Sequence, residues 1–183
     1  MDDILNQDRL LKEIFEKIIR ESRKDIIWRE IGEFKVDDFG KLDNLIDECN
    51  FKGIYFFEIK NNLKFDDIEQ WKQDFIDRWE ERTYKRKFVP NTRKSRLNKL
   101  IENQEWIPLY IGKSRKVSTR IKEHIYKPLE KNTFAMKLAA RENFNEEIFR
   151  VKVLEINVDH YDWIVPLVEK ELRNIYHPIV GKQ

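Results

Sequence analysis

The sequence contains little cysteine, histidine, glycine and proline, and each shortage excludes a class of protein. Its only cysteine among 183 residues, Cys49, rules out an internal disulfide and a cysteine-based zinc cluster. Three histidines are too few for a metal site built on several imidazoles. Five glycines and five prolines disfavour collagen-like, low-complexity and turn-dense all-β chains.

Long apolar runs are also missing, so no segment is predicted to span a bilayer. The opening residues, MDDILNQDRL, are acidic and polar and lack the pattern of a signal peptide. Apolar residues nevertheless make up 40% of the chain, which is enough for a buried core. We therefore expect a cytoplasmic protein of one domain, with or without an added arm and without a membrane partner.

Charge is balanced overall but unevenly distributed. The net charge is +2, yet residues 64–81 are rich in acids and residues 82–99 contain eight bases and no acid. A basic block flanked by aromatic side chains suits a phosphate backbone with stacked bases, although such runs are more often solvated surface. The candidate DNA-binding residues of this block are Arg82, Lys85, Arg86, Lys87, Arg93, Lys94, Arg96 and Lys99.

Hydrophobic periodicity predicts an α+β fold. Strands are expected at 53–60, 107–113 and 148–156, and helices at 3–23, 41–48, 65–79, 94–103, 116–126, 133–142 and 162–176. This order predicts a small three-stranded antiparallel sheet flanked by helices, with its first two strands adjacent. Residues 1–50 are expected to form an N-terminal helical arm. Residues 60–106 are expected to form a charged helical insert within a domain spanning 51–183.

Two of the predicted strands each carry a tyrosine close to a glycine. They read Gly53-Ile54-Tyr55 and Tyr110-Ile111-Gly112. Three further residues continue the pattern: Arg120 eight residues after the second glycine, His124 one helical turn later, and Glu169 in the last predicted helix, where the pattern E-x-x-L is followed by Pro178. In these features the sequence resembles the GIY-YIG endonuclease family over residues 51–59 and 107–183.

The resemblance implies a phosphodiesterase site with a role for each residue. Tyr55 is the candidate general base, and His124 either relays its proton or only orients it. Tyr110 would position water or a phosphate oxygen, and Arg120 would clamp the scissile phosphate with its planar guanidinium. Glu169 would hold Mg²⁺ or Mn²⁺, hard cations that prefer oxygen ligands.

The remaining motif residues have structural or secondary roles. Gly53 and Gly112 would allow close backbone approach at the strands. Lys113 either touches phosphate or is merely exposed. Glu171 is the second-choice acid because it points to another face of the helix. Without the family pattern, the simplest interpretation of Glu169 is a surface carboxylate paired with Arg173 one turn later.

Departures from the family pattern concern the insert and the chain end. More than 50 residues separate Tyr55 from Tyr110, where the family has a short connection. The asparagine that often follows the terminal proline is missing after Pro178. The insert is therefore expected to be either a DNA-recognition element, with Arg93, Arg96 or Asn98 as base readers, or a dimerisation helix.

The sequence thus predicts a metal-dependent endonuclease that cuts DNA, with a restriction-type enzyme as the leading subtype. A homodimer is compatible with cutting two strands. The alternatives are a nucleic-acid-binding module that has lost catalysis and a structure-specific repair or mobile-element nuclease. Outside the motif, we expect Cys49 to be a buried thiol, His160 a loop residue and His177 a cation at a helix end.

Overall fold

The protein has an α+β fold, as the sequence predicts. The computed structural model describes residues 2–24, 26–38, 40, 42–61, 67–102 and 104–181. Its helices are α1 (Asp2–Glu21), α2 (Leu42–Asp47), α3 (Ile68–Trp79), α4 (Lys94–Leu97), α5 (Val117–Tyr126) and α6 (Tyr161–Tyr176), with short 3-10 turns η1 (Leu138–Ala140) and η2 (Glu142–Phe144). Its strands are β1 (Arg29–Lys35), β2 (Gly53–Lys60), β3 (Asn91–Thr92), β4 (Trp106–Ser114), β5 (Ile148–Glu155) and β6 (Val180–Gly181).

The main sheet has four strands in the order β1-β5-β2-β4, so the predicted three-stranded sheet is wrong. The additional strand, β1, comes from the segment that we expected to be a helical arm. Its sequence, REIGEFK, has charges at four positions and a central glycine, which lowers its strand propensity. Ile31 and Phe34 are buried, and the Phe34 ring stacks on Phe149 of β5 with centroids 5.6 Å apart.

The first two predicted strands, β2 and β4, lie side by side and antiparallel, as expected. Lys60, the last residue of β2, pairs with Trp106, the first residue of β4. The 45 residues between them therefore begin and end at the same end of this strand pair. β4 is one of the two edge strands of the sheet, and the carbonyl of its Pro108 accepts the main-chain N–H of Ile179 at 2.9 Å. The C-terminal helix α6 packs against β4 at this edge.

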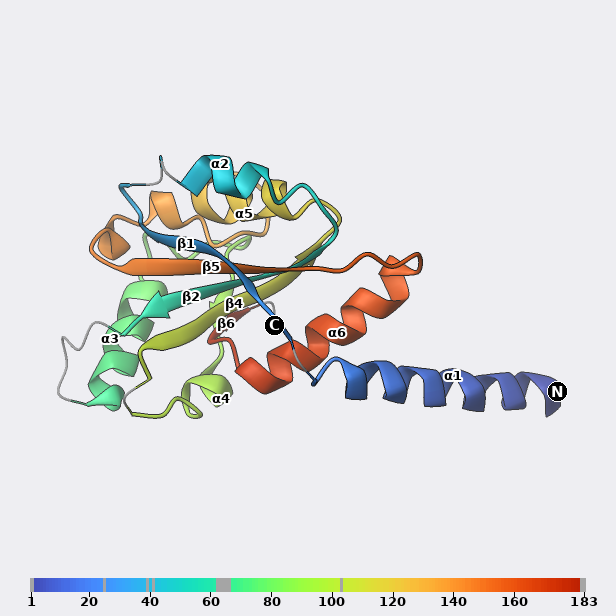
Figure 1. Cartoon of the computed structure of the whole chain (residues 1–183). Helices are drawn as coiled ribbons and strands as arrows, with labels where there is room; N and C mark the ends of the chain where they lie inside the picture. Colours follow the sequence, from blue (N-terminus) through green and yellow to red (C-terminus); the bar gives the residue numbers. More distant parts are fainter. Residues whose placement is uncertain are drawn as a thin grey trace.

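Helices cover both faces of the sheet (Figure 1). On one face Tyr55, Phe57 and Ile59 of β2 join a core that includes residues of α2, α3 and α5. On the other face Ile54 and Phe56 pack against the buried side of α6. Strand β2 is thus buried on both faces, which explains why GIYFFEIK is almost entirely apolar.

The 60–106 insert packs into the core of the domain. In α3 the rings of Trp71, Phe75 and Trp79 stack in sequence and are buried. The predicted helix begins at Ile68 with Asp67 as its N-cap, while Phe65 and Asp66 lie outside the described residues. Downstream, β3 pairs with β6 at the chain end, so the insert is fixed at two places.

The helix predicted at 133–142 is wrong. The described residues form only the turns η1 and η2 there. Lys137 is buried with φ 58°, and its ammonium group donates to the carbonyls of Leu129 and Lys131. Buried Arg141 lies 4.0 Å from the Trp79 ring. These tertiary contacts override the helix propensity of the sequence TFAMKLAARE.

α6 starts slightly earlier than predicted. His160, rather than Asp162, occupies its N-cap position, and Asp162 instead pairs with Arg115 at 2.7 Å. Pro166 is accommodated within the helix, which ends before Pro178 as expected. Among the described helices, none is long and apolar enough to cross a membrane.

Candidate active site

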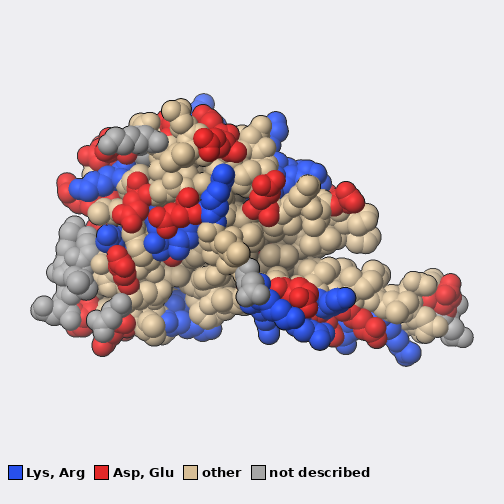
Figure 2. Space-filling model, viewed as in Figure 1, with Lys and Arg blue, Asp and Glu red and all other residues tan. Residues whose placement is uncertain are grey.

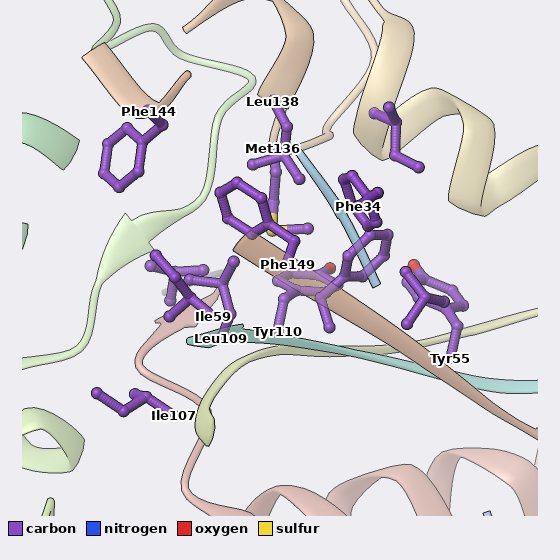
Figure 3. Packing of buried hydrophobic residues seen from close by; sticks show 14 of the residues in the cluster. Phe34, Tyr55, Ile59, Ile107, Leu109, Tyr110, Met136, Leu138, Phe144 and Phe149 are labelled. Atoms are coloured by element: carbon purple, nitrogen blue, oxygen red, sulfur yellow. The ribbon is translucent and has the colours of Figure 1, made fainter. Parts of the chain in front are cut away.

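The two motif tyrosines lie against each other at the β4 edge of the sheet. Tyr55 is in register with Gly112, where a Cβ atom would lie 2.3 Å from the Tyr55 hydroxyl and 2.9 Å from a ring carbon of Tyr110. Only glycine therefore fits at position 112 without moving a ring. The tyrosine rings stack 6.1 Å apart and point to the same side of the sheet (Figure 3). Gly53 is equally restricted, because a Cβ there would lie 2.1 Å from the Leu154 carbonyl oxygen.

His124 on α5 completes this cluster from above the sheet. Its Nε2 lies 3.0 Å from the Tyr55 hydroxyl, and the main-chain N–H of Met136 donates to its Nδ1 at 3.2 Å. Burial lowers the pKa of His124 well below 6.5, and the charge of Arg120 adds to this. A neutral imidazole carries one proton, and Nδ1 is occupied as an acceptor, so the proton sits on Nε2. His124 therefore donates to the Tyr55 oxygen.

Both tyrosines are protonated near neutral pH. Burial raises the pKa of Tyr55 well above 10, and Tyr110 adds to this, while Arg120 partly offsets it. Burial also raises the pKa of Tyr110 against the opposing charges of Arg173 and Arg120. Tyr55 would therefore need further positive charge beside it before it could accept a proton as a general base.

Arg120 lies at the rim of the cluster on α5. Its guanidinium donates to the Glu123 carboxylate and to the carbonyl of Phe134. Its side chain is 22% exposed, so part of the fork remains accessible. Burial acts to lower the pKa of Arg120, but Tyr55 and Glu123 outweigh it, and the pKa is raised. A permanently charged planar group thus lies beside the tyrosine hydroxyls.

Glu169 reaches the same edge from α6, on the other face of the sheet. Its side chain is only 7% exposed, and Lys113 of β4 pairs with its Oε2 at 2.9 Å. Arg173 pairs with its Oε1 at 2.6 Å and also donates to the carbonyl of Ile111 at 3.4 Å. The simpler interpretation, a pair with Arg173, is thus present, but the carboxylate is buried rather than on the surface.

Glu169 offers a divalent cation one carboxylate as a protein ligand. The described residues contain no group of three or more His, Cys, Asp or Glu side chains that could hold a metal ion. One ionised carboxylate has about four lone-pair sites, and the two ion pairs use two of them. Mg²⁺ prefers oxygen and keeps several waters, so a single carboxylate is an acceptable protein ligand. The ammonium group of Lys113 would oppose the ion by charge.

The second half of the predicted DNA-binding block lies close to this site. Arg96 on α4 donates to the carbonyl of Pro178, directly after α6. Burial lowers the pKa of Arg96, and the positive charges of Arg93 and Arg173 act in the same direction. Lys99 lies 3.5 Å from the His177 ring. Like charges collected in this way favour a polyanionic partner.

The first half of the block lies on the other side of the cluster. The carbonyl of Phe88 accepts a hydrogen bond from the main-chain N–H of Ala135. Ala135 follows Phe134, whose carbonyl accepts from the Arg120 guanidinium. Lys87 lies over the Phe88 ring, while Lys85 pairs with Glu80 at 2.9 Å. The remaining predicted contacts in the insert, Arg82, Arg86 and Lys94, are exposed.

Residues outside the predicted site behave differently from one another. Glu171 pairs with Arg23 at 2.7 Å and so faces away from Glu169, as expected. Cys49 is buried, as predicted. His160 is exposed at the start of α6. His177 occupies the C-cap of α6, as predicted, but burial and the charges of Lys99 and Arg96 lower its pKa, which opposes the predicted cationic form.

Three contacts of the site were not predicted from the sequence. They are the Lys113–Glu169 pair, the Arg120–Glu123 pair and the bond from Met136 to His124. The spacing of Arg120 and Glu123 on one helix could have indicated the second pair. The other two join segments far apart in the chain, and no local pattern signals them.

Comparison of the chain with models of known protein families, with characterised proteins and with solved structures finds no match.

Proposed function

We propose that the protein is a divalent-metal-dependent endonuclease that hydrolyses phosphodiester bonds in DNA. The observation that carries the proposal is the cluster around the Tyr55 hydroxyl: Tyr110 and His124 contact it, Arg120 lies beside it, and Glu169 reaches the same sheet edge. These groups come from β2, β4, α5 and α6, and a core needs no such gathering of titratable side chains.

Each group has a chemical task in this proposal. Arg120 supplies a fixed positive charge for the scissile phosphate, whose transition state carries extra negative charge. Tyr55 would first release its own proton to bulk water once the charges of the substrate complex lower its pKa, and the resulting phenolate would take a proton from the attacking water. His124 holds the Tyr55 oxygen by donating from Nε2 and stabilises the phenolate. The tautomer favours this orienting role over the proton relay, because neither ring nitrogen can accept the Tyr55 proton. Tyr110 positions a phosphate oxygen.

Glu169 would hold the metal ion, with Lys113 and Arg173 as the cationic groups that compete for its oxygens. A bound Mg²⁺ or Mn²⁺ would supply charge neutralisation and an activated water. Lys113 itself becomes available to a phosphate oxygen when Glu169 binds a cation.

The proposed substrate is duplex DNA, and restriction-type cleavage is the leading subtype. Basic residues of the insert flank the tyrosine cluster on two sides, one group near Arg120 and one near Arg173. A phosphate backbone that crosses the cluster would meet both groups, which together contribute the salt-dependent part of binding. A homodimer would allow both strands to be cut in one encounter.

Plasmid cleavage tests the proposal. Supercoiled plasmid, methylated or unmethylated, is incubated with the protein and Mg²⁺ or Mn²⁺, and the product ends are sequenced. Wild-type protein should give discrete fragments, and Glu169→Gln should give none while binding DNA at least as tightly. Glu171→Gln is the matched control, because the same change on the same helix faces Arg23 instead. Absence of cleavage with either metal, combined with retained DNA binding, would favour the inactive binding module.

A further inference from the structure

α1 projects from the protein body and is largely unpartnered (Figure 1). Each residue from 3 to 14 is exposed, and the exposed apolar side chains include Ile4 at 73% and Ile14 at 52%. The helix meets the body only toward its C-terminal end, where Ile18 packs in the cluster beside α6 among the described residues. In proteins most of the stability of a helix comes from packing of its apolar face, and residues 3 to 14 of α1 are exposed, so a partner on this face would stabilise them.

The apolar side chains of α1 form a continuous stripe. Ile4, Leu11 and Ile18 recur every seven residues, and Ile14 and Phe15 lie beside them on the same face. In Figure 2 uncharged atoms lie along the upper side of α1 and charged atoms along its lower side. A stripe of this width is typical of a helix that packs against another helix.

A hollow of about 380 Å³ lies at the base of α1. Its wall is mainly apolar and is formed by Lys17, Ile18, Glu21, Ser22, Ile26, Leu154 and Val168. A cavity of roughly 150 Å³ already accommodates a benzene ring. The hollow therefore has room for more than one large apolar side chain, and the stripe of α1 leads directly into it through Ile18.

The two ends of the helical segment carry opposite charge. Residues 2–9 hold three aspartates and one arginine, whereas residues 17–24 hold four basic residues and one glutamate. Arg23 and Lys24 already pair with Glu171 and Glu21, so Lys17 and Arg20 are the bases of α1 that would meet the acidic end of a partner. An antiparallel pair of identical helices would place each acidic end beside the basic end of its partner. A parallel pair would place like charges together. Antiparallel helix dipoles add to the preference.

We propose that α1 packs antiparallel against α1 of a second copy of this chain, with Ile4 of each copy entering the hollow of the other. Leu11 and Ile14 then meet near the two-fold axis, and Asp3 lies close to the basic end of the partner helix. The inference names the surface of the proposed homodimer. It concerns α1 alone and does not depend on the cleavage chemistry.

Sedimentation equilibrium of the full chain, without DNA or metal, tests the pairing over a concentration series. Wild-type protein should sediment at twice the chain mass of 22.5 kDa. Leu11→Glu should raise the dimer dissociation constant at least about 100-fold, because it buries an unpaired charge. Asn6→Glu adds the same charge on the polar face and should leave the dimer intact. A wild-type monomer at all concentrations, or equal effects of the two variants, would overturn the proposal.

Charge reversal tests the antiparallel orientation. Asp3→Lys should weaken the dimer, and adding Lys17→Asp in the same chain should restore at least part of it, because positions 3 and 17 again carry opposite charges. Circular dichroism melting of each variant checks that the body remains folded. A dimer that the single reversal leaves unchanged, or that the second reversal weakens further, would contradict antiparallel pairing. Because none of these measurements uses cleavage, loss of the dimer and loss of nuclease activity are distinguishable.

Discussion

Gly112→Ala is the sharpest test of the proposed site, because the structure defines what a single methyl group would meet. The new Cβ would lie 2.3 Å from the Tyr55 hydroxyl and 2.5 Å from the ring carbon that carries it. Ordinary contacts begin at 3.4 Å, so the ring would have to move by about 1 Å. Tyr55 is 1% exposed and packed between Phe57, Tyr110 and His124, so it cannot move freely.

The expected effect has a stability part and an activity part. Overpacking of this kind costs about 1–3 kcal/mol, and loss of the 3.0 Å contact with His124 would add about 1 kcal/mol. A shift of about 1 Å in a catalytic group lowers the cleavage rate about 100-fold. Urea unfolding measures the first part, and single-turnover cleavage of plasmid DNA measures the second.

Gly181→Ala is the matched control, because a Cβ at that position meets nothing within 4 Å. It should match wild type in urea unfolding and in cleavage. If Gly112→Ala unfolded and cleaved like this control, Tyr55 would not lie against position 112. If it were destabilised but still cleaved normally, the tyrosine cluster would be a core feature without a catalytic role.

Three further predictions address charge. Lys113→Met should tighten Mg²⁺ binding about tenfold in calorimetry without DNA, because it removes the ammonium group 2.9 Å from Glu169; unchanged affinity would exclude competition. Lys94→Gln with Lys99→Gln should reduce the salt slope of DNA binding by about 1 per residue; an unchanged slope would remove α4 from the interface. Below pH 6.5 the imidazole of His124 takes up a proton in the unfolded chain but not in the folded protein, where it is buried. The free energy of unfolding of the wild type should therefore fall by up to about 1.4 kcal/mol per pH unit, and that of His124→Gln should fall less.

Sequence periodicity predicted the parts of the fold where local pattern and tertiary burial agree. The strands β2, β4 and β5 are apolar on at least one face, and α1 and α3 show clear helical spacing. β1 was not predicted, because a strand that alternates charges around a glycine resembles a loop until β5 pairs with it. The helix predicted at 133–142 failed for the opposite reason, since Lys137 and Arg141 are drawn inward to carbonyl groups.

In the candidate site, too, local spacing predicted some features, and contacts between distant segments decided the others. Spacing placed Arg120 and His124 on one face of α5, and the order of elements made the motif strands neighbours, but the register that sets Tyr55 opposite Gly112 was not predicted. Spacing could not predict protonation, which depends on contacts between distant segments. Arg141 illustrates the support for those contacts: its guanidinium donates to the carbonyl of Met136, the residue whose N–H binds His124.

The protonation states at the site therefore depend on the 134–141 segment as much as on the motif residues. Its carbonyl at Phe134 holds Arg120, and its N–H at Met136 fixes the proton of His124 on Nε2. The same segment is bound to the insert through Phe88 and Trp79. Since the insert also carries the basic residues, a DNA backbone that binds it would act on the segment that sets the hydrogen bonds of Tyr55. Under the proposed function, DNA binding and proton transfer would then be physically connected. A shorter connection between the motif strands, which could not reach this segment, would leave them independent.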